Sequence, residues 1–532
     1  MNAKGKYLLL LAAILLPTML SACGGSEQAY STRSSGGTTG AMAQATSTTG
    51  SAAANNSYLI APQSGAEKEA PAADQGGTDS WAAPPVEALP PNPFITTSED
   101  HLSTFAMDVD TGSYSAARNY INTGTLPPAE TVRVEEFVNY FHYDYPTPQT
   151  DAFGIYVDSA PAPFGQSNNQ IVRVGIQGRR IAAENRKDAV LTFVIDVSGS
   201  MQQPNRLPLV KQALRLLVDE LNQADQIGIV VYGSQARVLL AHTTAANKDT
   251  ILAAIDSLQD EGSTNAEAGL RLGYDLASKH FVPGAINRVI LCSDGVANVG
   301  ETGPDGIRKQ IRDYTAQGVD LTTIGFGMGD YNDQLMEQLA DDGNGNYAYV
   351  DNLGEAKRIF VENLTGTLQV IAKDAKIQVD FNPAIVARYR LVGYENRAVA
   401  DQDFRNDTVD AGEVGAGHSV TALYEVELVK EAAPGAALTV QVRYADAQDG
   451  QVREISKPFE RREFGGSLDD AEPHLQLAVA VAAFAEQLRS APGQAELGRQ
   501  VLSLAQRAAG ALSQDADVQE FAQLVVRASN LK

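Results

Sequence analysis

Cysteine is nearly absent from this 532-residue chain, which contains only Cys23 and Cys292. One disulfide at most could form within the chain, and none could form if Cys23 were covalently modified. The folded parts must therefore be stabilised by hydrophobic cores rather than by cross-links. Cys292 follows the apolar residues 289–291, and this pattern predicts a buried and unreactive thiol.

Positive charge is the second deficit. The chain has 41 lysines and arginines against 65 aspartates and glutamates, and its formal net charge is −24. A surface of this sign repels the phosphates of nucleic acids and the anionic head groups of lipids. We therefore expect no nucleic-acid partner and no electrostatic binding to a membrane surface.

Long hydrophobic runs are also missing. The one continuous apolar run is residues 7–20, which follows Lys4 and Lys6. Its length of about 14 residues is too short for a transmembrane helix, which needs roughly 20. A short apolar run behind two lysines is typical of a secretory signal peptide, which we place at residues 1–22.

The end of this run carries the residues Leu20-Ser21-Ala22-Cys23. They resemble the lipobox of bacterial lipoproteins, and the resemblance implies cleavage before Cys23 and acylation of that cysteine. Acyl chains would then hold the protein on a membrane without crossing it. Glycine at position 24, in place of aspartate, implies by the same resemblance the outer membrane, with the protein facing the periplasm. The alternative is an ordinary secretory signal with a chance cysteine.

Residues 23–97 contain mostly Ser, Gly, Thr, Ala, Gln and Pro, with few large apolar side chains. Such a composition buries too little apolar surface to fold, so we expect a disordered tether. By the scaling of flexible linkers, a chain of this length reaches roughly 45 Å. The folded part would therefore stand clear of the membrane.

The folded part is expected to begin with a module at residues 98–187. Residues 99–150 predict a small and mostly helical unit, and residues 154–158 and 170–177 alternate like strands. Alternation returns in residues 371–465, and the helical spacing of Ala and Leu predicts two or three helices in residues 466–532. The simplest arrangement is a β-sandwich built from both sets of strands, with the intervening domain inserted into it.

The intervening residues 188–370 alternate regularly between apolar strands and amphipathic helices. The predicted strands are residues 189–195, 226–232, 237–240, 288–292, 320–324 and 347–350. The predicted helices are residues 209–221, 250–258, 266–278, 306–317, 334–340 and 355–368. This alternation indicates an α/β fold, with a doubly wound and mostly parallel sheet covered on both faces. Ligands of such sheets bind at the carboxyl ends of the strands.

Polar side chains with oxygen atoms follow two of these strands. Asp196, Ser198 and Ser200 leave the first strand at alternate positions, so their oxygens can converge on one point. Asp294 ends the fourth strand, and Thr264 lies in the loop before the third helix. Oxygen donors without imidazole or thiolate suit Mg²⁺, Mn²⁺ or Ca²⁺. A simpler alternative is that Asp196 and the two serines only cap the following helix.

Together these five residues resemble the metal-ion-dependent adhesion site of von Willebrand factor type A domains, which have a Rossmann-like fold. The resemblance implies that Ser198, Ser200 and Thr264 bind the cation through their hydroxyls. Asp196 and Asp294 would act directly or through water. It further implies an open coordination position, which an Asp or Glu side chain of a partner protein can fill.

Two other patterns receive simpler interpretations. Residues 325–329, Gly-Phe-Gly-Met-Gly, lack the spacing and the helix start of a dinucleotide-binding loop and predict a turn beside the metal site. Residues 108–112, Asp-Val-Asp-Thr-Gly, resemble the start of a calcium loop. However, glycine stands where a ligand belongs and Asn119 replaces the terminal glutamate. We interpret residues 108–112 as a turn or a helix cap.

The wider sequence resembles bacterial lipoproteins of the YfbK type. Residues 105–111, 126–128, 132–136 and 143–146 are similar to the module before the A domain of that family, and the region after residue 370 is similar to its companion domain. This wider resemblance implies the architecture of the chain. The adhesion-site resemblance and the predicted lipid anchor together predict an envelope-anchored binding protein that is not an enzyme and whose partner is an envelope or extracellular protein.

A hydrolase that uses the same cation to activate water is the alternative function. The sequence has no His-Glu-x-x-His, no Gly-x-Ser-x-Gly and no phosphate-binding-loop motif. The six histidines are scattered along the chain: His101, His142, His242, His280, His418 and His474. These absences favour binding over catalysis.

The lipobox generates a first prediction. Replacing Cys23 by Ser should release the protein from membranes or leave it uncleaved, because serine has no thiol to acylate. Fractionation of cells grown with radiolabelled palmitate measures this, and Cys292→Ala should keep both label and location. Unlabelled wild-type protein in the soluble periplasmic fraction would contradict the lipid anchor.

Overall fold

The computed structural model describes residues 90–163, 169–295, 303–327, 333–409, 411–432, 434–490 and 495–531. The predicted signal peptide, Cys23 and the tether up to residue 89 lie outside the described residues. Within the described ranges, each helix is too short or too polar to span a bilayer.

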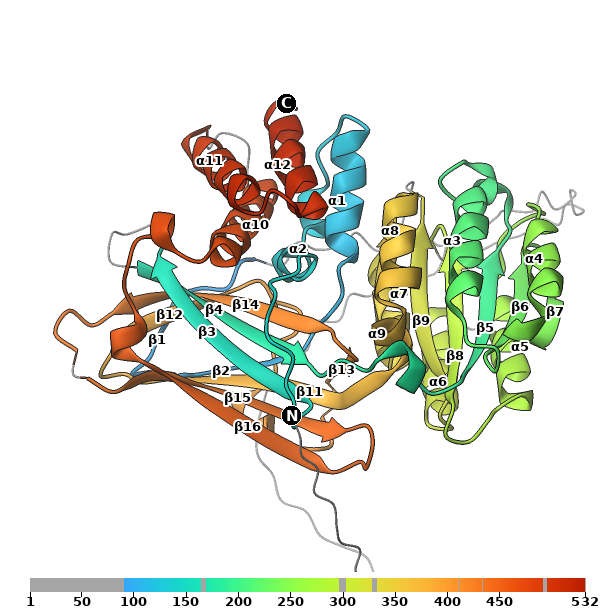
Figure 1. The fold of residues 1–532 in the computed structure, drawn as a ribbon, viewed down its shortest axis with the longest axis horizontal. Helices are drawn as coiled ribbons and strands as arrows, with labels where there is room; N and C mark the ends of the chain where they lie inside the picture. The colour runs from blue at the N-terminus through green and yellow to red at the C-terminus, as the bar shows by residue number, and fades with distance from the viewer. Residues whose placement is uncertain are drawn as a thin grey trace, which may run out of the picture. The chain divides into compact units, whose positions relative to one another are not determined.

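Two antiparallel sheets form a β-sandwich (Figure 1). The first sheet has the order β1 (Ile95–Thr96), β12 (Val386–Val392), β14 (Ser419–Leu428), β4 (Asn169–Gly178) and β3 (Phe153–Pro161). The second has the order β13 (Gly412–Gly415), β11 (Val370–Phe381), β15 (Ala436–Asp446) and β16 (Val452–Glu460), and β2 (Leu102–Ala106) also pairs with β11. Strands from both sides of the α/β domain thus share each sheet.

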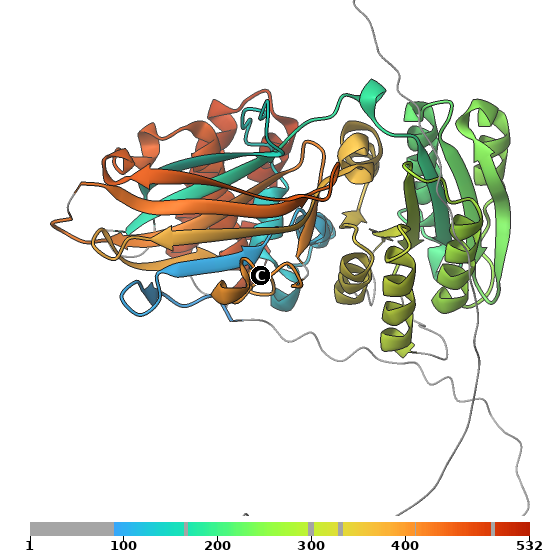
Figure 2. The same ribbon diagram turned by 90° about the horizontal axis from the view of Figure 1, so that it is seen from below.

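Alternate residues of the strands fill the space between the two sheets, which Figure 2 shows as separate layers. Val172 and Val174 of β4 are fully buried there, as are Ile377 and Val379 of β11. The period-2 pattern that predicted these strands therefore reflects one face that packs on the opposite sheet.

The beginning of the folded part differs from the prediction in two ways. The tether was expected to extend to residue 97, but Asn92 donates to the carbonyl oxygen of Gly393 (2.8 Å), and β1 pairs with β12. The unit beginning at residue 99 was expected to be mostly helical, but β2 joins the second sheet before α1 (Gly112–Asn122) and α2 (Val134–Asn139). Both strands are short, and their paired residues lie 270 to 294 positions later in the sequence.

Three C-terminal helices cover the outer face of the first sheet (Figure 1): α10 (Pro473–Arg489), α11 (Ala495–Ala511) and α12 (Ala516–Ser529). Buried alanines and valines of α10 pack against Val392 of β12 and Leu423 of β14. Phe521 of α12 contacts Phe141, which follows α2 (ring centroids 5.5 Å apart). The helices therefore share one hydrophobic core with the N-terminal module.

The α/β domain has a six-stranded sheet in the order β10-β9-β8-β5-β6-β7, parallel except for β7. Its strands are β5 (Ala189–Asp196), β6 (Gln226–Tyr232), β7 (Ala236–Thr244), β8 (Ile286–Ser293), β9 (Asp320–Phe326) and β10 (Tyr347–Val350). Its helices are α3 (Leu207–Glu220), α4 (Lys248–Asp256), α5 (Ala266–Lys279), α6 (Gly303–Thr315), α7 (Asp333–Asp342), α8 (Leu353–Lys357) and α9 (Leu364–Leu368). The predicted doubly wound α/β fold is confirmed.

Helices cover both faces of this sheet (Figure 2). Ile195 of β5 belongs to the core beneath α3, α4, α8 and α9, whereas its neighbour Val194 belongs to the core beneath α5, α6 and α7. Cys292 is fully buried, and burial raises the pKa of its thiol well above the ordinary value. One predicted helix, residues 355–368, is interrupted: a π-helical turn, Arg358–Glu362, separates α8 from α9.

The α/β domain is inserted into the sandwich. The chain leaves the first sheet at the end of β4, enters the domain at β5, and returns from α9 to β11 of the second sheet. The insertion that the sequence predicted is therefore present.

A buried arginine joins the domain to the N-terminal module. Arg118 of α1 is 2% exposed, and its Nε and Nη2 donate to the two carboxylate oxygens of Asp351 (2.8 and 2.6 Å). Nη2 also donates to Glu355 of α8 (2.9 Å), and Nη1 donates to the hydroxyl of Tyr140 (2.7 Å). The α8 side of the α/β domain is thus fixed to α1 and α2 by ion pairs shielded from water.

Replacing Arg118 by Met should lower the free energy of unfolding by about 3–5 kcal/mol, because Asp351 and Glu355 would lose a cationic partner while staying buried. Urea denaturation of the purified protein measures this. The control is Arg405→Met, which removes an exposed arginine paired with Glu454 and should change stability by less than about 0.5 kcal/mol. Equal stability of the two variants would contradict the role assigned to Arg118.

Candidate metal site

The site forms where the central strand β5 ends. Ile195 pairs with Cys292, so Asp196 and Ser293 leave β5 and β8 side by side. Ser293 Oγ donates to Asp196 Oδ2 (3.1 Å), and both side chains are completely buried. In the sheet, β6 lies on one side of β5 and β8 lies on the other. Where the order of strands reverses in this way, a doubly wound sheet has a ligand-binding crevice at the carboxyl ends of its strands.

The turn after β5 brings the predicted serine ligands together. The Ser198 amide donates to Asp196 Oδ1 (2.8 Å), which folds the turn over the carboxylate. The hydroxyl oxygens of Ser198 and Ser200 lie 3.0 Å apart. Two adjacent ligands of an octahedral Mg²⁺ at about 2.1 Å would be separated by about 3.0 Å. The spacing of the two serines therefore fits direct binding to one Mg²⁺.

The loop that carries Thr264 is hydrogen-bonded to this turn. The Glu261 amide donates to the carbonyl oxygen of Val197 (2.5 Å), and the Gly199 amide donates to that of Gly262 (3.0 Å). Gly262 has φ +73°, which favours glycine, and a Cβ there would lie 2.1 Å from the hydroxyl oxygen of Ser234. Thr264, half-buried, precedes the Asn265 cap of α5.

Asp294 follows β8 and is bound by an arginine. Arg206 Nη1 donates to Asp294 Oδ2 (2.5 Å) and to the carbonyl oxygen of Ser200 (2.8 Å). The structure therefore brings Asp196, Ser198 and Ser200 together, connects the Thr264 loop to them by backbone hydrogen bonds, and holds Asp294 through Arg206.

The electrostatics of the site suit a cation. Burial raises the pKa of Asp196 to about 6; hydrogen bonds from Ser198 oppose the shift, and the negative charge of Asp294 adds to it. A buried carboxylate beside a second carboxylate is costly without a counter-charge. Since the donors are hard oxygens, the residues fit Mg²⁺, Mn²⁺ or Ca²⁺. Such a cation would act as a Lewis acid toward an incoming ligand.

Sequence reasoning missed Ser293 and Arg206. Ser293 stands directly before the recognised Asp294, and the register of β5 with β8 is what places it on Asp196. Arg206 is one of several arginines without a motif around it. In the glycine-rich stretch predicted as a turn, Gly327 has φ +75° and contacts the Arg206 side chain, while residues 328 and 329 lie outside the described residues.

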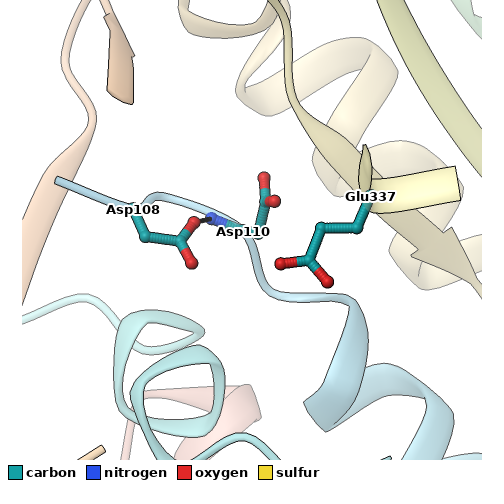
Figure 3. A group of neighbouring side chains, drawn as sticks. All are labelled: Asp108, Asp110 and Glu337. Atoms are coloured by element: carbon teal, nitrogen blue, oxygen red, sulfur yellow. Dashed lines mark hydrogen bonds between the residues drawn. The ribbon is translucent and has the colours of Figure 1, made fainter. Parts of the chain in front are cut away.

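A second group of carboxylates lies elsewhere. Figure 3 shows Asp108 and Asp110, from the loop between β2 and α1, beside Glu337 of α7, and one oxygen of each lies within 4.8 Å of the others. The Asp110 amide donates to Asp108 Oδ1 (2.8 Å), a local hydrogen bond within the segment that leads into α1. The side chain of Thr111 makes no capping hydrogen bond to α1.

Arginines already neutralise much of this second group. Arg397 donates to Asp108 (3.0 Å), to Glu337 (2.7 Å) and to Asp341 (2.9 Å), and Arg133 also bonds Glu337. The group adjoins a cavity of about 440 Å³ between the α/β domain and the sandwich. We assign these ion pairs to holding α7 against the companion domain.

Comparison with known proteins gives three family matches. The family described as "von Willebrand factor type A domain" matches residues 191–362, "von Willebrand factor" matches residues 86–173, and "Uncharacterized protein YfbK, C-terminal" matches residues 366–531. The fold and the turn after β5 thus define a protein with a von Willebrand factor type A domain, a class whose members often mediate protein–protein interaction.

Relatives that match most of the chain identify its family within this class. The chain is 38% identical to Uncharacterized protein YfbK of Escherichia coli K12, over 75% of this chain and 73% of the relative. It belongs to the YfbK family. It is also 27% identical to Uncharacterized protein sll0103 of Synechocystis, over 56% of this chain and 71% of the relative. A solved von Willebrand factor type A structure from Catenulispora acidiphila is 16% identical with a TM-score of 0.42, covering 70% of this chain and 89% of that chain.

Asp196→Asn should separate the charge of the site from its metal binding. Without metal at pH 7.5, we expect the variant to be more stable than the wild type by about 1–3 kcal/mol, because a buried charge is removed. The raised pKa gives the sign: the stability contributed by protonated Asp196 is complete below pH 3.8 and is lost as the pH rises through about 6. The advantage of the variant should therefore vanish near pH 4.

Thermal melting with Mg²⁺ and with chelator measures metal binding by the wild type and by Asp196→Asn. If the dissociation constant is about 0.1 mM, 1 mM Mg²⁺ should stabilise the wild type by roughly 1.4 kcal/mol and Asp196→Asn not at all. Asp219→Asn, which changes an exposed aspartate of α3, should keep the full response. An equal Mg²⁺ response in Asp196→Asn and the wild type would rule out the site.

Proposed function

We propose that this protein is a binding protein of the bacterial envelope, in which a divalent cation at Asp196, Ser198, Ser200, Thr264 and Asp294 engages an acidic side chain of a protein partner. The observation that supports this proposal most directly is that the hydroxyl oxygens of Ser198 and Ser200 lie 3.0 Å apart beside the buried Asp196 carboxylate. Ser200 is exposed while Asp196 is fully buried. A cation between them would therefore have protein ligands on one side and solvent on the other.

The ligand set explains why the partner would be acidic. Hydroxyl ligands are neutral, so they reduce the charge of the cation little, and the cation keeps a strong preference for an anionic oxygen. A carboxylate from Asp or Glu satisfies this preference with the same hard oxygen chemistry. The bond would form only in the presence of metal.

Hydrolysis is less well supported. A metal-bound water needs a nearby general base, and imidazole is the usual one at neutral pH. The histidines have other surroundings: His242 lies against His280 with tilted rings (centroids 4.5 Å apart), His101 pairs with Asp380, and His474 pairs with Glu472. His142 and His418 line a small cavity beside α9.

The envelope setting is a separate part of the proposal and depends on residues 20–23. A lipid on Cys23 and a flexible tether would place the domain at the outer membrane, facing the periplasm, within reach of envelope proteins. Failure of the anchor would change the compartment of the protein but not the chemistry of the metal site.

Capture of partners from envelope extracts tests the binding role. The purified chain from residue 24 onward should retain a partner in Mg²⁺. Chelator, which removes the cation, and Thr264→Ala, which removes one of its ligands, should each reduce the retained amount at least tenfold. Thr250→Ala, an exposed threonine of α4, serves as the matched control and should capture normally. A partner set unchanged by chelator and by Thr264→Ala would contradict the metal-dependent mechanism.

A further inference from the structure

We propose that Arg206 is a positioning residue that makes the metal site selective for anionic ligands. The inference rests on the proposed function, since it concerns the same cation. Arg206 binds Asp294 and the backbone of Ser200 at once, so it joins two of the segments that carry proposed ligands.

The environment of Arg206 holds its guanidinium in place. Its side chain and that of Asp294 are only 7% and 8% exposed, so solvent screens the pair weakly. Arg206 directly precedes α3, which fixes its backbone between the turn after β5 and the helix.

Gly327, directly after β9, also packs against the Arg206 side chain. A Cβ at this position would lie 2.3 Å from Cγ and 2.5 Å from Nε of Arg206, and the φ of +75° is itself unfavourable for other residues. The absence of a side chain at Gly327 therefore lets the backbone directly after β9 pack on the arginine stem. The ends of β5, β8 and β9 thus meet at one side chain.

The charge of Arg206 has a consequence for the bound cation. Asp196 and Asp294 together would cancel the formal charge of a divalent ion, and the completed site would be neutral. Arg206 offsets the charge of Asp294, so the site with metal carries a net positive charge. Positive charge at short range weakens cation binding but strengthens the binding of an anion to that cation. Arg206 therefore lowers the affinity of the site for the cation and raises the affinity of the bound cation for a carboxylate.

The test uses Mn²⁺ as the metal and acetate as the carboxylate probe, with the full chain. Free Mn²⁺ is measured by electron paramagnetic resonance, and acetate binding to the Mn²⁺ complex by water-proton relaxation. Arg206→Gln, which keeps amide donors but loses the charge, should bind Mn²⁺ on the order of tenfold more tightly and acetate on the order of tenfold more weakly than the wild type. Arg206→Lys should restore both values to within about threefold.

Two controls separate charge from structure. Arg215→Met removes an exposed arginine of α3, the helix that follows Arg206, and should change both affinities less than about twofold. Thermal melting in chelator checks that each variant is folded, and Arg206→Met provides the same loss of charge with different packing if Arg206→Gln does not fold.

The outcomes are distinct. Weaker Mn²⁺ binding by the neutral variants, as expected if Arg206 only supports the loops, would overturn the inference, and so would acetate binding equal to that of the wild type. A wild type that binds no Mn²⁺ would instead overturn the proposed function and the inference with it.

Discussion

Two arginines, Arg118 buried and Arg397 partly buried, hold the α/β domain against the rest of the protein. Arg118 reaches Asp351 and Glu355 on one side of the domain, and Arg397 reaches Glu337 and Asp341 of α7. Removing these charges from water is costly, and only the complete set of ion pairs and hydrogen bonds offsets that cost. The attachment therefore tolerates little change of geometry, which makes it specific rather than merely strong.

The position of this attachment keeps the candidate site apart from the contacts with the N-terminal module. The contacts to the N-terminal module involve β10, at one edge of the sheet, where Asp110 accepts a hydrogen bond from the amide of Tyr347 (3.1 Å). The strand order puts β9 and β8 between that edge and β5. Asp196 is therefore supported by the middle of a rigid sheet, while Ser200 remains exposed. A site on regular, well-packed elements keeps its ligands pre-organised.

The predictions from sequence succeeded where the relevant residues are near neighbours in the chain. Alternation along β5 and β8 is local, and so is the placement of Asp196, Ser198 and Ser200 on one turn. The sequence could not predict pairings whose partners lie hundreds of residues away, such as β2 with β11 or Asp108 with Arg397. Arg206 is an intermediate case: it is only six residues from Ser200, but its partner Asp294 is known only from the packing of three strand ends.

The insertion also determines how the protein would transmit tension. β2, before the inserted domain, is hydrogen-bonded to β11, after it, and β4 is hydrogen-bonded to β14. A pull between the N-terminal segment and the C-terminal helices would therefore pass through the sandwich, and the inserted domain would lie outside the line of force. If the proposed lipid anchor and the proposed metal-dependent partner both held the protein, the force would instead enter through the candidate metal site. In that geometry the two connections of the inserted domain, from β4 and to β11, would share the load in parallel.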